Sequence, residues 1–130
     1  MSATLLVGVL TAATTQPVEM VREYRADLEF VETDDGGVTR SMTRFAFPLD
    51  GGVIESPENL PGTVPMLTGT VTVDGAANMV ASHMRLCRPD RSACEELARP
   101  ELTFALGKSG TFYFAGPDFS VRLTLSPVED

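Results

Sequence analysis

Residues 23–47 alternate between apolar and polar side chains, and the alternation is broken once, by two acids and two glycines. A period of two is typical of a strand with one buried face, because successive side chains of a strand point to opposite sides. Asp34-Asp35-Gly36-Gly37 supplies residues that suit a tight turn. The segment therefore predicts a β-hairpin. The apolar residues of its first arm share one face: Tyr24, Ala26, Leu28 and Phe30.

The charged side chains of the two arms predict the register. Pairing Thr33 with Val38 sets Asp27 opposite Arg44 on the outer face, which is a favourable cross-strand pair. A slip of one residue would turn these charges toward the core. On the inner face the same register pairs Ala26 with Phe45 and Leu28 with Thr43.

The alternation returns in residues 67–73 and, after Asp74-Gly75, in residues 78–88, where a strand is favoured over an amphipathic helix at 76–87. Three further strands follow within residues 102–125, and their turns predict a meander. The core residues expected from this meander are Phe104, Phe112, Phe114, Val121, Leu123 and Leu125.

We therefore expect an all-β protein, an antiparallel β-sandwich of immunoglobulin-like type with about seven to nine strands. A short helix at 93–99 is the one alternative element, because Ser92 and Glu95 fit a capping box. The chain has 130 residues, which is the size of one domain, and residues 17–130 are assigned to it. Residues 1–16 carry no charged side chain and read either as a signal-peptide-like segment without a basic start or as a buried first strand. Their apolar run is too short to span a bilayer.

The formal net charge is −8, which argues against nucleic-acid binding because such proteins need a basic face. It likewise disfavours an anionic membrane surface. The bias toward arginine, nine against one lysine, suits a bacterial protein from a GC-rich genome.

The only two cysteines, Cys87 and Cys94, flank Pro89-Asp90. Such a pair can close a disulfide across a turn, which places the protein in an oxidising compartment, the periplasm or the exterior. The alternatives are two unbridged thiols and a thiol pair that exchanges disulfides. In the last case a helix at 93–99 would favour the thiolate of Cys94 through the helix dipole.

The local layout is a strand that ends at Cys87, then a turn, then Cys94 and the next strand. This layout resembles the N-terminal periplasmic domain of bacterial transmembrane thiol-disulfide interchange proteins. The resemblance covers residues 80–106 and implies an immunoglobulin-like sandwich with a redox-active cysteine pair. Glu95-Glu96-Leu97 stands where that family often has two prolines.

No catalytic residue, metal ligand or cofactor site is expected. His83 is the only histidine, and no metal-ligand spacing surrounds it. Gly107-Lys108-Ser109-Gly110 lacks the earlier glycine and the following helix of a phosphate loop and predicts a hairpin turn. The acids at 34–35, and Glu55 with Glu58, lack the ligand spacing of a calcium loop.

The sequence thus favours a non-enzymatic, exported binding or assembly module with a protein partner, and the alternative is a periplasmic thiol-disulfide exchange domain using Cys87 and Cys94. Two surfaces are candidates for binding. One is an exposed sheet edge that accepts a partner strand. The other is the proline- and glycine-rich segment 48–66, with these candidate residues: Val53, Ile54, Glu55, Glu58 and Leu60.

Overall fold

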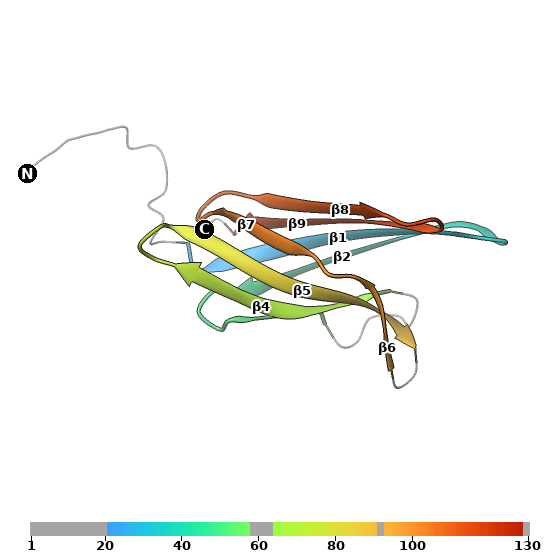
Figure 1. The fold of residues 1–130 in the computed structure, drawn as a ribbon, viewed down its shortest axis with the longest axis horizontal. Coiled ribbons are helices and arrows are strands. Elements are labelled where there is room, and N and C mark those ends of the chain that lie inside the picture. The colour runs from blue at the N-terminus through green and yellow to red at the C-terminus, as the bar shows by residue number, and fades with distance from the viewer. Residues whose placement is uncertain (1–20, 58–63, 91–92, 129–130) are drawn as a thin grey trace, which may run out of the picture.

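The computed structural model describes residues 21–57, 64–90 and 93–128, which form nine β-strands and no helix (Figure 1). The predicted all-β class is confirmed. The segment 1–16 and the candidates Glu58 and Leu60 lie outside the described residues. The strands are β1 (Glu23–Asp34), β2 (Gly37–Pro48), β3 (Val53–Glu55), β4 (Met66–Asp74), β5 (Met79–Asp90), β6 (Ala93–Ala98), β7 (Glu101–Ala105), β8 (Gly110–Ala115) and β9 (Phe119–Pro127).

The first sheet is antiparallel, with strand order β2-β1-β9-β8. β1 and β2 form the predicted hairpin, and every register pair is as expected, including Thr33 with Val38 and Asp27 with Arg44. The hairpin is long, and its tip extends past the other sheet (Figure 1). β2 and β8 are the two edges of this sheet.

The second sheet is also antiparallel and runs β3-β4-β5, with both β6 and β7 along the far side of β5. β6 pairs with the end of β5 and β7 with its beginning. Between them the amide of Met84 donates to the carbonyl of Pro100 at 2.8 Å. β6 and β7 therefore act as one edge strand, interrupted at Arg99-Pro100.

The alternative helix at 93–99 is wrong, because Ala93–Ala98 is strand β6. The capping-box pattern is local, whereas β6 gains a ladder of hydrogen bonds to β5 that a helix there would lose. The strand favoured for residues 78–88 is confirmed as β5.

The predicted meander is wrong in its first step. β7 pairs with β5 in the second sheet, and the chain then crosses to the first sheet, where only β8 and β9 pair. Of the six core residues expected there, Phe114 is 41% exposed and Phe112 is partly buried. Phe114 lies on the edge strand β8, where its ring packs 5.8 Å from the ring of Phe119.

Buried side chains from both sheets form one core, which includes Tyr24, Leu28, Ile54, Leu67, Leu86 and Leu123. Tyr24 is fully buried, yet its hydroxyl is satisfied at the crossing between the sheets. It donates to the carbonyl of Lys108 at 2.8 Å and accepts from the amide of Gly107 at 2.9 Å. Gly107 has a φ of 90°, as expected for the predicted turn.

Gly69 allows β4 and β5 to approach closely. A Cβ at this position would lie 2.3 Å from the carbonyl oxygen of His83 and 2.7 Å from the Cα of Met84. Both are backbone atoms that a side-chain rotation cannot move, so glycine is required here.

Candidate functional site

The predicted binding segment is only partly available on the surface. Ile54 is fully buried in the core, whereas Val53 is 55% exposed and Glu55 is exposed. All three belong to β3, which pairs with β4. The three described candidates therefore form a short strand of the sheet, and Ile54 is not accessible to a partner.

The two cysteines lie in the hairpin formed by β5 and β6. Cys87 pairs with Glu96, and Cys94 pairs with Pro89, so the two positions lie diagonally across the ladder. Cys87 is half-buried, and no described cysteine is a free thiol. The side chain of Cys94 lies outside the described residues, so the Cys87–Cys94 bridge stays a prediction.

The thiol-exchange alternative loses one of its arguments. Because residues 93–98 are a strand, no helix dipole acts on Cys94, and the acids Glu95 and Glu96 oppose a thiolate nearby. The cysteine pair itself is the remaining support for this alternative.

Arg88, next to Cys87, joins the two sheets. Its guanidinium contacts Glu32 of β1 through Nη1 and lies 3.3 Å from Glu95 of β6 through Nε. It also lies over the ring of Phe30, 5.9 Å from the centroid. Arg88 therefore closes this end of the core and acts as a structural residue.

A shallow, open depression of about 550 Å³ lies where β5 meets the interruption between β6 and β7. Glu96 accepts from the Nε atoms of Arg85 at 2.9 Å and Arg99 at 2.6 Å, and His83 lies 3.4 Å from Glu101. The hydrogen bond from Arg99, joined by that from Arg85, holds the pKa of Glu96 below its ordinary value. The two arginines that line the depression are therefore already bound to Glu96, and His83 lies beside the carboxylate of Glu101.

Four edges border the two sheets, and three of them are short or interrupted. β3 has three residues, and β8 has six and is followed by Gly116-Pro117. The edge formed by β6 and β7 is broken by a register shift opposite Leu86 and Cys87 and by Pro100. Short strands, bulges and prolines are among the means by which proteins prevent pairing at an edge.

β2 has none of these protections over most of its length. It spans 12 residues with its only proline at the last position, and no strand of the described residues pairs with its outer edge. Val38 and Met42 are each 68% exposed. An uninterrupted edge of this length offers a template for another strand.

The hydrogen-bonding phase of the ladder shows which peptide groups of β2 point to the open side. Leu49 donates to the carbonyl of Arg22, continuing the β1–β2 ladder, whereas the amide of Thr33 turns away to Asp118 beside β9. Even-numbered residues of β1 therefore bond to β2, and their partners in β2 are odd-numbered. The peptide groups that face away from β1 are those of Val38, Arg40, Met42, Arg44 and Ala46.

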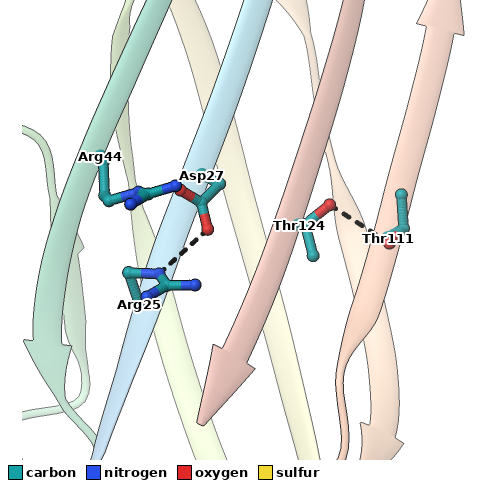
Figure 2. A network of polar contacts seen from close by, with 5 residues as sticks. All are labelled: Arg25, Asp27, Arg44, Thr111 and Thr124. Atoms are coloured by element: carbon teal, nitrogen blue, oxygen red, sulfur yellow. Dashed lines mark hydrogen bonds and ion pairs between the residues drawn. The ribbon is translucent and has the colours of Figure 1, made fainter. Parts of the chain in front are cut away.

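The side chains of these even-numbered β2 residues lie on the outer face of the sheet. Figure 2 shows one row across all four strands, from Arg44 through Asp27 and Thr124 to Thr111. Asp27 accepts from Arg44 at 2.5 Å and from Arg25 at 3.1 Å. Partial burial works to raise the pKa of Asp27, but the hydrogen bonds and the charges of the two arginines together outweigh it and hold the pKa below its ordinary value.

Metal binding finds no support within residues 21–57, 64–90 and 93–128, where no group of three or more histidine, cysteine, aspartate or glutamate side chains is placed to hold an ion. The same described ranges include no helix long and apolar enough to cross a membrane.

Comparisons with protein families, curated proteins and solved structures find no match for this chain.

The edge position of β2 was not predictable from the pattern of its residues. The alternation identified β2 as a strand and β1 as its partner, but nothing in residues 37–48 says whether a second strand covers the other side. The absence of proline before Pro48 was the one available signal.

Proposed function

We propose that this chain is a non-enzymatic binding or assembly module of the bacterial envelope, periplasmic or secreted, which accepts an extended strand of a partner protein at the outer edge of β2. The scaffold is a β-sandwich of immunoglobulin-like type. The observation that carries the proposal is the length and openness of β2, with five peptide groups directed away from β1. Strand addition of this kind obtains affinity from main-chain hydrogen bonds and specificity from side chains at alternate positions.

β2 supports this role better than β8, the other edge of the same sheet. The β8–β9 ladder directs only the peptide groups of Thr111, Tyr113 and Ala115 outward, because Gly116 bonds back to Phe119. Three outward groups form a shorter ladder than five, and each added backbone hydrogen bond contributes about 1 kcal/mol.

The first test is amide hydrogen exchange of the full chain, measured residue by residue by NMR. In the free protein we expect fast exchange at Arg40, Met42 and Arg44 and slow exchange at their odd-numbered neighbours. Protection of the even-numbered amides that is independent of protein concentration would show the edge to be covered by the chain itself. That result would overturn the proposal.

The second test uses proline as a backbone block. Met42→Pro removes an outward amide without breaking a bond to β1, and proline is tolerated on edge strands in this orientation. We expect the variant to fold and to lose binding of a strand-forming peptide of alternating Thr and Val. Thr111→Pro makes the same change on the β8 edge and is the matched control. Equal loss of binding in both variants, or in neither, would contradict a site at β2.

A further inference from the structure

The edge strands differ in charge, and β2 stands apart. It carries Arg40 and Arg44 and no acid, although the whole chain has a net charge of −8. β3, β6 and β7 carry glutamates without a basic residue, and β8 carries no charge. β2 is thus the one basic edge among the described strands.

The two acids nearest to Arg40 and Arg44 do not cancel the charge of these arginines. Asp27 is shared by Arg44 and Arg25. Glu29 lies 3.5 Å from Arg40 and is also opposite Arg122 of β9. Each of these two carboxylates therefore lies beside two arginines.

Both β2 arginines have terminal nitrogens available to a partner. Arg40 contacts Glu29 and Arg44 contacts Asp27 through Nε, and the two arginine side chains are each 66% exposed. A guanidinium bound through Nε still presents its terminal nitrogens to a second carboxylate.

Resting on the proposed function, we propose that the occupant of the β2 edge is an extended acidic segment of another protein. Its outer-face residues are acidic, apolar and acidic at alternate positions, opposite Arg40, Met42 and Arg44. The two carboxylates are four residues apart, about 14 Å along a strand. The pattern reads the same in both directions, so it fits a parallel or an antiparallel partner.

A second copy of the chain does not suit this edge. Pairing of β2 with β2 would gather four arginines along one seam, and like charges on neighbouring strands are destabilising. The uncharged segment 1–16 offers no carboxylate to the arginines. Charge complementarity therefore favours an acidic partner over either of these.

The experiment measures binding of three peptides of about ten residues, long enough to match the edge. They share a Thr/Val frame with a central leucine. They differ at the positions two residues before and two residues after it, which hold two Glu, two Gln or two Lys. Affinity to the full chain is measured by fluorescence anisotropy at about 0.01 M and about 0.15 M salt, where the Debye lengths are about 30 Å and 8 Å. We expect the Glu peptide to bind about tenfold more tightly than the Gln peptide at low salt, with a smaller ratio at higher salt.

The double variant Arg40→Glu with Arg44→Glu provides a sharper test. It should reverse the preference, so that the Lys peptide binds best and the Glu peptide worst. Met42→Pro should abolish binding of all three peptides, and Thr111→Pro should leave it intact. A reversal of this kind cannot arise from a general loss of folding.

The outcomes separate this inference from the proposed function. Equal affinity for the Glu and Gln peptides, with both lost in Met42→Pro, overturns the acidic partner and leaves strand addition standing. No binding of any peptide overturns both. Protection of the even-numbered β2 amides that grows with protein concentration shows a second copy at the edge and overturns the acidic partner.

Discussion

Tyr24→Phe tests how the two sheets are joined at the crossing from β7 to β8. The hydroxyl of Tyr24 makes two hydrogen bonds, to Lys108 and from Gly107, while its ring packs 5.5 Å from Phe104. The substitution removes the hydroxyl alone and leaves the ring in place. We expect the free energy of unfolding to fall by about 1–2 kcal/mol. This is the lower part of the range for a buried polar group that loses its hydrogen-bond partner, because water partly reaches Gly107 and Lys108.

The assay is urea unfolding followed by circular dichroism, with Tyr113→Phe as the matched control. The midpoint should fall in Tyr24→Phe at an unchanged slope, because the surface exposed on unfolding stays the same. Tyr113 is 59% exposed and lies over Arg122, and its variant should stay within about 0.5 kcal/mol of the unsubstituted protein. Equal midpoints for all three proteins would refute the role assigned to the Tyr24 hydroxyl.

The pH dependence adds a second check on the same residue. Burial raises the pKa of Tyr24 above its ordinary value, although the hydrogen bonds with Gly107 and Lys108 work against it. A raised folded pKa means that the stabilisation is fully present below about pH 10 and is lost as pH rises through the folded value. The difference between the unsubstituted protein and Tyr24→Phe should therefore shrink at alkaline pH, and a constant difference would contradict this account.

Three further predictions concern other parts of the fold. Gly69→Ala should lower the free energy of unfolding by about 1–3 kcal/mol, measured by urea unfolding, because the new Cβ would meet the backbone of β5. Gly75→Ala is the control and should be nearly neutral, because nothing lies within 4 Å of a Cβ there. Similar losses in both variants would show that close approach is not the cause. The pKa of Asp27 is lowered, so its contribution to stability is present above about pH 4 and is lost as pH falls through the folded pKa. Asp27→Asn should therefore flatten the acid side of the plot of unfolding free energy against pH. An unchanged plot would contradict the pairing of Asp27 with Arg44 and Arg25. A structural Cys87–Cys94 bridge should show a reduction potential below about −300 mV in glutathione buffers, and a value above about −230 mV would revive the exchange alternative.

The β1–β2 hairpin was predicted to the residue because its information is local. The turn residues limit the loop, and the apolar alternation leaves one register that keeps Asp27 and Arg44 out of the core. The same alternation favoured a strand for residues 78–88, which is β5 in the structure. The capping-box helix failed because the capping-box pattern takes no account of β5, which pairs with residues 93–98.

The sequence predicted the kind of candidate site but not its residues. An exposed sheet edge was one of two predicted binding surfaces, but the residues named for binding belonged to the other, and Ile54 among them is buried. The meander failed for a related reason, since β7 and β8 are joined by a turn that also permits a crossing between sheets.

The sequence by itself determined where strands form, which faces they bury and how β1 and β2 align, because alternation and turn chemistry act over a few residues. The tertiary structure decided the order of strands within each sheet and left one side of β2 without a partner among the described strands. An edge is defined by the absence of a neighbour, and that neighbour would come from a distant part of the chain. No pattern within β2 specifies it, so the surface proposed to bind a partner is a property of the assembled sheets.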